Sequence, residues 1–210
     1  MMLTEIKLTC ILTVALAFEA SATPLQLLTQ FDGRQSQIAV REMQQEIDRL
    51  YRDVHVPILW HDLAGYQSVG ETPRIVFIHF VGDCRPLRMP PIQNVAGIAL
   101  GGVSRVDGRI LPLIKIDCDR VARYVWPSMT GPDRVRGDAV YGRALARVVA
   151  HELYHCLTGT AKHTRSALFR ADISPKALLA NELDFGASEV ADLKKALARP
   201  AREPSQFKGI

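Results

Sequence analysis

Two histidines and a glutamate lie close together in the segment His151-Glu152-Leu153-Tyr154-His155. Side chains four residues apart on an α-helix lie one above the other, so His151 and His155 can offer imidazole nitrogens to one ion. Zinc binds such a pair readily. Glu152 lies about a hundred degrees around the helix from His151, where its carboxylate can hold a water molecule without becoming a ligand. The spacing therefore predicts a zinc site with hydrolytic chemistry.

The residues before this segment predict the helix that the site needs. Ala144, Leu145, Val148 and Val149 are apolar at helical spacing, with further alanines between them. Buried histidines and a buried glutamate on such a helix require partners for their polar atoms. Asp138 lies where it can cap the start of the helix.

Two basic residues, Arg143 and Arg147, precede His151 by two turns and one turn of the predicted helix. A cation next to a dication is electrostatically costly, so we expect both side chains to point toward solvent. The alternative without a metal is a core helix whose histidines are satisfied by hydrogen bonds and whose Glu152 reaches solvent.

The five-residue segment resembles the active-site helix of the zincin metallopeptidases, in which two histidines bind zinc and the glutamate is the general base. The order of the preceding elements, a helix and then strands, is similar to that of the metzincin branch. That branch continues H-E-x-x-H-x-x-G-x-x-H, with a third histidine as ligand. Here Gly159 and His163 follow His155 one and two residues later than in that pattern.

The third ligand has two candidates. Gly159 can adopt the left-handed conformation that ends a helix, and the turn would bring His163 toward the ion. The rival is a carboxylate from a later helix, as in the thermolysin-like branch, whose Asn-Glu signature is resembled by Asn181-Glu182. Glu182 follows His155 at a longer spacing than that branch uses. We expect Glu182 and Glu189 to be surface acids, and we assign His163 as the ligand.

Metzincins also place a methionine-containing turn beneath the metal, after the third ligand. No methionine follows Met129 in this chain. The resemblance thus covers the helix motif strongly, Gly159 and His163 weakly, and the C-terminal third not at all.

Residues 1–22 have the pattern of a secretory signal peptide. Lys7 lies in a short polar start, an apolar run covers residues 8–18, and Ala20-Ser21-Ala22 is a typical cleavage site. The run is too short to span a bilayer. We therefore expect a secreted or periplasmic protein without stable membrane insertion after cleavage.

The remaining residues, 23–210, suffice for a single domain with a hydrophobic core. The chain carries a net charge of +4, and its basic residues are scattered, so nucleic-acid binding is not expected. Loose ends are predicted at 23–36 and 199–210. No pattern indicates an oligomeric state.

Three cysteines follow the expected cleavage site. In an oxidising compartment we expect a disulfide between Cys84 and Cys118, because each follows a strand-like run. Cys156 directly follows His155 on the apolar helix. It is interpreted as a small buried residue, because a thiolate at this position would face away from the ion.

Other segments predict the elements that position the motif. Residues 36–54 have the three- and four-residue periodicity of an amphipathic helix. Residues 74–81 are continuously apolar, which is typical of a central strand, and residues 54–60 predict a shorter strand. Residues 95–103 and 110–116 predict a hairpin around Asp107-Gly108, and the resemblance implies that one arm could pair with an extended substrate.

The predicted fold class is α+β and zincin-like. A small twisted mixed sheet packs on an N-terminal helix and a buried active-site helix, and the C-terminal part is helical. Zn²⁺ held by His151, His155 and His163 would activate water, with Glu152 as general base, to hydrolyse a peptide or protein substrate. The alternatives are a catalytically inactive zincin-fold binding protein of the cell envelope and a metal-free envelope protein.

Overall fold

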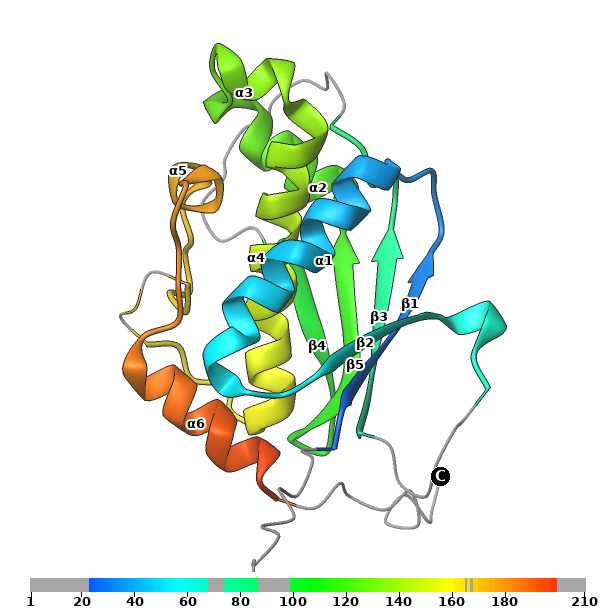
Figure 1. Cartoon of the computed structure of the whole chain (residues 1–210), viewed down its shortest axis with the longest axis vertical. Helices are drawn as coiled ribbons and strands as arrows, with labels where there is room; N and C mark the ends of the chain where they lie inside the picture. The colour runs from blue at the N-terminus through cyan, green and yellow to red at the C-terminus, as the bar shows by residue number, and fades with distance from the viewer. Residues whose placement is uncertain (1–22, 68–73, 87–98, 165, 167, 200–210) are drawn as a thin grey trace, which may run out of the picture.

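The computed structural model describes residues 23–67, 74–86, 99–164, 166 and 168–199 (Figure 1). One layer is a five-stranded sheet with the order β2-β1-β3-β5-β4, and only β4 is antiparallel to its neighbour. The strands are β1 (Leu25–Phe31), β2 (Ile58–Asp62), β3 (Arg74–Val81), β4 (Gly101–Val106) and β5 (Arg109–Asp117).

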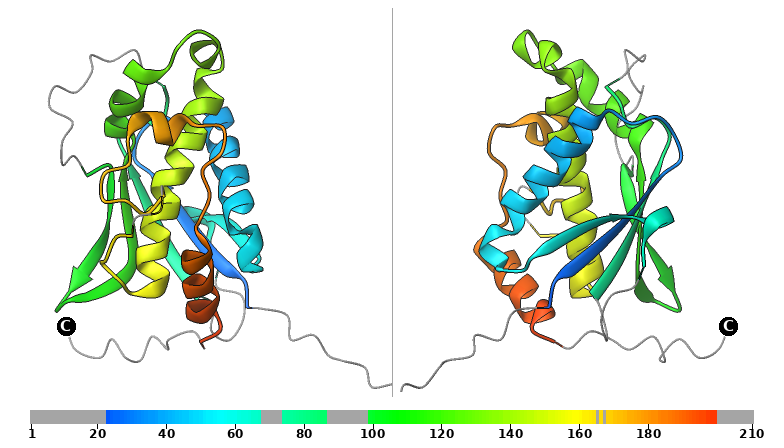
Figure 2. Two further views of the ribbon diagram at one scale, coloured as in Figure 1. Left: turned by 90° about the vertical axis from the view of Figure 1, so that its left-hand side faces the viewer. Right: turned by 45° about the vertical axis from the view of Figure 1, so that its right-hand side comes forward.

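The second layer consists of two long helices that lie on one face of the sheet (Figures 1 and 2). The α-helices are α1 (Gln37–Tyr51), α2 (Cys118–Val125), α3 (Pro132–Val135), α4 (Gly137–Thr158), α5 (Pro175–Leu179) and α6 (Ala187–Leu197). The predicted mixed sheet, the N-terminal helix, the buried motif helix and the helical C-terminal part are all present.

Helices α1 and α4 pack closely because α4 has a glycine at the contact. A Cβ atom on Gly142 would lie 2.3 Å from the carbonyl oxygen of Ala39 in α1. Ser36 caps α1, and its hydroxyl accepts a hydrogen bond from the Ala39 N–H. We expected Asp138 to cap α4, and this prediction was wrong. Arg136 precedes the helix, and Asp138 lies in its first turn, where its charge still favours the positive helix end.

The first strand corrects the prediction of a loose end at 23–36. Leu25–Phe31 pairs with β2 on one side and β3 on the other, so it is an interior strand. Leu25 and Leu27 are fully buried. The run lacks β-branched residues except Thr29, and Leu28 on the opposite face is also buried, so neither strand propensity nor alternation marks it in the sequence.

The predicted hairpin is confirmed between β4 and β5. Asp107 and Gly108 both have positive φ, 49° and 74°, as a two-residue type I′ turn requires. Pro112 lies where the register of the two strands shifts, so its missing N–H breaks no regular ladder pair. Strand β4 forms one edge of the sheet.

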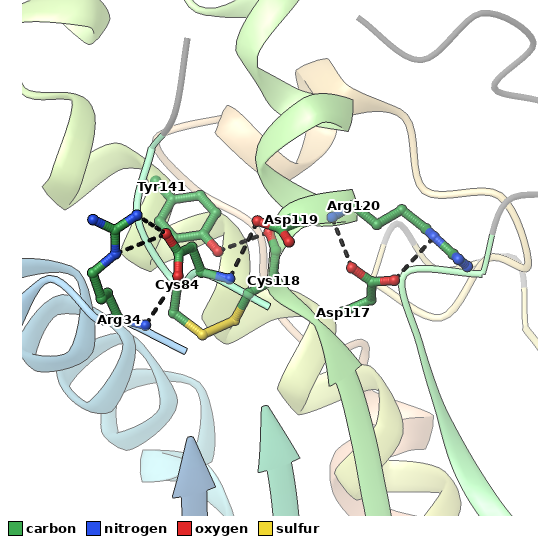
Figure 3. The surroundings of a disulfide bond; sticks show 8 residues. Arg34, Cys84, Asp117, Cys118, Asp119, Arg120 and Tyr141 are labelled. Carbon is green, nitrogen blue, oxygen red and sulfur yellow. Dashed lines mark hydrogen bonds and ion pairs between the residues drawn. A yellow bond between two sulfur atoms is a disulfide. The ribbon is translucent and has the colours of Figure 1, made fainter. Parts of the chain in front are cut away.

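The predicted disulfide joins Cys84, just after β3, to Cys118 at the start of α2 (Figure 3). The Tyr141 hydroxyl of α4 donates a hydrogen bond to the Cys118 carbonyl at 3.0 Å. The disulfide and this bond together tie the carboxyl ends of the central strands to the N-terminal half of α4.

Some predicted segments lie outside the described residues. These are the signal segment 1–22, residues 95–98 of the first hairpin arm, and residues 200–210 of the tail. Of the helices that the structure describes, none combines the length and apolar character needed to cross a membrane.

Candidate metal centre

The motif lies in the C-terminal half of α4, where the helix is covered by α1 and the sheet. His151 and Glu152 are each 8% exposed and His155 is 4% exposed. Every residue of α4 from Ala144 to His155 is buried, so the helix is covered on all sides here, as its many apolar residues require. Polar side chains at such positions need partners.

The two histidines of α4 are oriented by backbone carbonyl groups. His151 Nδ1 lies 2.9 Å from the Leu168 carbonyl oxygen, and His155 Nδ1 lies 2.7 Å from that of Thr160. A carbonyl oxygen only accepts hydrogen bonds, so each Nδ1 carries the proton. In neutral rings both Nε2 atoms are then left with a lone pair.

These two lone pairs point at each other. The Nε2 atoms of His151 and His155 are 3.0 Å apart. Burial lowers the pKa of His151 to about 4 and also lowers the pKa of His155, so a shared proton is disfavoured near neutral pH. Two facing acceptors are stabilised by a cation between them. Bonds of 2.0–2.1 Å to a tetrahedral zinc ion separate two nitrogen donors by about 3.3 Å, close to the observed distance.

The third histidine joins this pair through a turn. Gly159 ends α4 with a φ of 70°, and its N–H donates to the His155 carbonyl at 3.0 Å. Beyond the turn, His163 is exposed, and its ring centroid lies 4.9 Å from that of His155. One donor atom from each of the three histidines lies within 4.8 Å of the others. The stretched spacing thus still brings all three histidines together, and their donor set suits zinc.

A segment that we did not single out from the sequence lies beneath the histidines. Leu168 and Phe169 are fully buried, and the Phe169 ring stacks on His151 with centroids 5.4 Å apart. The Leu168 carbonyl is the acceptor for His151 Nδ1. Their hydrophobicity was a signal for burial, but nothing local in the sequence linked them to His151.

Glu152 lies on the side of the helix that faces the edge strand. A Cβ on Gly101 of β4 would lie 3.3 Å from Glu152 Cγ, so the glycine makes room for this side chain. Burial raises the pKa of Glu152 to about 7, and the charge of Arg105 on β4 opposes the rise. A carboxyl group with this pKa can both take and return a proton near neutral pH.

Arg147 does not point toward solvent and corrects our prediction. It is fully buried, and its Nε donates to Glu46 of α1 at 2.9 Å. Its Nη1 donates to the carbonyl oxygens of Leu178 and Ala180 at 2.9 and 2.7 Å. Glu46, which lies 101 positions earlier in the chain, neutralises the charge of Arg147, so this side chain can be buried away from solvent.

The remaining candidates lie apart from the histidines. Glu182 is exposed, as predicted, and does not belong to the cluster of possible ligands. Glu189 is not a surface acid, because it is only 1% exposed and accepts a hydrogen bond from Thr164. Cys156, expected to be a small buried residue, is partly buried, and desolvation raises the pKa of its thiol to about 12.

Comparison with known proteins gives a likeness of fold. No family model and no curated protein matches the sequence. Among solved structures, the chain is similar to the crystal structure of archaemetzincin from Methanopyrus kandleri, with a TM-score of 0.51 and 14% identity. The match covers 88% of this chain and 100% of that one. The chain thus has a fold similar to that of archaemetzincin, and it gathers three histidines on the motif helix and the turn that follows it.

Proposed function

We propose that the protein is an exported zinc metallopeptidase that hydrolyses peptide bonds. The observation that carries the proposal is the pair of Nε2 lone pairs that face each other at 3.0 Å, each fixed by a carbonyl group behind its ring. Such carbonyl groups behind the rings are typical of histidines that bind metal. His163 would complete a set of three protein ligands and leave one position open.

The surroundings of the histidines suit peptide hydrolysis. Bound zinc supplies Lewis acidity toward water and toward the substrate carbonyl. Glu152 accepts a proton from the attacking water and donates it to the leaving amine, and its pKa of about 7 suits both steps. Among the strands that the structure describes, β4 is an edge strand and lies next to Glu152, where an extended peptide would pair with it.

The disulfide supports export. A bond between Cys84 and Cys118 persists in oxidising compartments, which is consistent with the signal-like residues 1–22. We propose a secreted or periplasmic protein that acts on a peptide or protein substrate, without nucleic acid and without stable membrane insertion.

The test begins with zinc content per chain, measured by elemental analysis after purification without added metal. We expect one zinc ion in the wild type and in Glu182→Ala, and little or none in His163→Ala. Glu182→Ala is the matched control, because it removes the rival ligand. A wild type that takes up no zinc even after supplementation would overturn the proposal.

Cleavage is then measured on a mixture of peptides with mass-spectrometric detection. Glu152→Gln should keep its zinc and lose activity by about 10²- to 10⁴-fold, the usual contribution of a general base. Zinc in the wild type without cleavage of any peptide would instead support the inactive binding protein.

A further inference from the structure

Helix α6 contributes a buried carboxylate to the segment that follows His163. Glu189 Oε1 accepts a hydrogen bond from the Thr164 hydroxyl at 2.6 Å, and Oε2 accepts one from Ser188 at 3.2 Å. A Cβ on Gly186 would lie 2.3 Å from Oε2, so the chain wraps closely around this group. Thr164 is the neighbour in sequence of His163, and Glu189 therefore holds the backbone at the third histidine.

The segment held by Glu189 is a closed turn. The Thr164 N–H donates to the Phe169 carbonyl at 3.0 Å, and the Phe169 N–H donates to the Ser166 carbonyl at 3.2 Å. His163 enters this turn, and the Leu168 carbonyl near its other end accepts from His151 Nδ1. One short turn thus places two of the three histidines relative to each other.

Glu189 is an unusual residue to bury for packing alone. It is 1% exposed, and among the described residues no Lys or Arg forms an ion pair with it. A buried carboxylate is costly unless hydrogen bonds satisfy it. Its donors here are hydroxyl groups, one of them on the residue next to His163. The Glu189 carboxylate is therefore linked to His163 through the hydrogen bond from Thr164.

We infer that Glu189 is a positioning residue for zinc, acting through Thr164 to hold His163 in place for binding. The inference rests on the proposed function, because it requires His163 to be a ligand. Outer partners of metal ligands typically contribute 10- to 100-fold to metal affinity. Glu189 contacts the residue next to His163 rather than His163 itself, so we expect it to contribute about tenfold to zinc affinity, the lower end of this range.

The experiment measures the zinc dissociation constant by competition with a chromophoric chelator. Glu189→Gln should weaken zinc binding about tenfold, because an amide has one acceptor where the carboxylate serves hydroxyl groups on two sides. Thr164→Val removes the hydroxyl partner at nearly constant volume and should give a similar loss. It also keeps the inference testable should Glu189→Gln fail to fold.

Asp192→Asn is the matched control from the same helix. Asp192 accepts a hydrogen bond from the Tyr154 hydroxyl at 3.0 Å, and the amide oxygen of asparagine still serves that single donor. We expect its zinc affinity to stay within about twofold of the wild type. Urea unfolding of the metal-free variants shows separately how much each change destabilises the fold.

A double-mutant cycle with His163→Ala separates positioning from a general structural role. If Glu189 acts through His163, adding Glu189→Gln to His163→Ala should weaken residual zinc binding by less than twofold. A tenfold loss that persists without His163, or unchanged affinity in both Glu189→Gln and Thr164→Val, would overturn the inference while leaving the zinc site intact. A wild type without zinc would instead refute the proposed function itself.

Discussion

Two buried polar clusters lie one turn apart on α4, and they differ in the partners that the protein supplies: an ion pair and carbonyl groups at the first, and carbonyl groups alone at the second. At Arg147, the guanidinium donates to the Glu46 carboxylate and to the carbonyl groups of Leu178 and Ala180. The positive charge has its counter-charge within the fold, and only Nη2 of this guanidinium lacks a hydrogen-bond partner among the described residues. This cluster joins α4 to α1 and to the end of α5.

In the second cluster, which consists of His151, Glu152 and His155, only the Nδ1 atoms of the two histidines have hydrogen-bond partners on other elements of the protein. The Nδ1 atoms have carbonyl partners, whereas the Nε2 atoms face each other. Among the described residues, the Glu152 carboxylate has no hydrogen-bond donor, and burial raises its pKa to about 7. The first cluster thus joins α4 to its neighbours, whereas the second leaves its Nε2 atoms and its carboxylate without a counter-charge in hydrogen-bond contact among the described residues, as the proposed zinc site would require.

The largest expected effect comes from breaking the buried ion pair of the first cluster. Glu46→Ala leaves the fully buried Arg147 without its counter-charge, and we expect the free energy of unfolding to fall by about 3–5 kcal/mol. Urea unfolding of the metal-free protein measures this. Zinc content per folded chain should not change, because the Glu46 carboxylate accepts hydrogen bonds from Arg49 and Arg147 and not from the histidines.

A surface ion pair provides the control for this change. Asp133 and Arg136 lie 3.9 Å apart, with Arg136 well exposed and Asp133 partly exposed, so Asp133→Ala should cost less than about 1 kcal/mol. An equal effect of the two changes, or loss of zinc from folded Glu46→Ala protein, would contradict the division into two clusters.

The unsatisfied cluster should reduce the stability of the metal-free protein in a pH-dependent way. The pKa of Glu152 is about 7 in the folded protein and near 4.5 when unfolded, so the folded state binds the proton more tightly. Stability from this group is fully present below pH 4.5 and is lost as the pH rises toward 7. Glu152→Gln removes that loss and should be more stable than the wild type by about 3 kcal/mol at pH 8, with no difference at pH 4.

Unfolding curves at several pH values test this prediction. The lowered pKa of His151 acts in the opposite direction, since its contribution is lost as the pH falls from 6.5 toward 4, but it is common to both proteins and cancels in the difference. Glu182→Gln, at an exposed position away from the histidines, is the matched control and should change the free energy of unfolding by less than about 0.5 kcal/mol. A constant difference for Glu152→Gln would mean that Glu152 is not desolvated in the folded protein.

The sequence was informative where a pattern is local. Helical spacing located His151, Glu152 and His155, Gly159 marked the end of the helix, and continuous hydrophobicity located β3 with the bounds that the structure has. Each of these signals lies within a few consecutive residues. The disulfide between Cys84 and Cys118 was also predicted, because each cysteine follows a strand-like run.

What the sequence did not reveal depends on distant partners. Arg147 is buried because Glu46 lies across the helix pair, and Glu189 is buried because Thr164 reaches it from 25 residues earlier. A charged residue on a helix looks the same in sequence whether its partner is water or a distant side chain. Strand β1 was missed because its residues carry no strand pattern and its partners, β2 and β3, are distant in the sequence.

The smallest expected effect comes from filling the space beside Glu152. It tests whether the edge strand β4 helps to position this side chain. A Cβ on Gly101 would lie 2.8 Å from Ile116 Cδ1 and 3.3 Å from Glu152 Cγ, so Gly101→Ala should displace the carboxylate and destabilise the fold by about 1–2 kcal/mol. Peptide cleavage should slow by about tenfold, because a general base acts only at short range. Gly102→Ala is the matched control, since its Cβ would meet no atom within 4 Å. If both alanines leave cleavage unchanged, Glu152 is positioned by α4 alone, and the edge strand has no part in completing the second cluster.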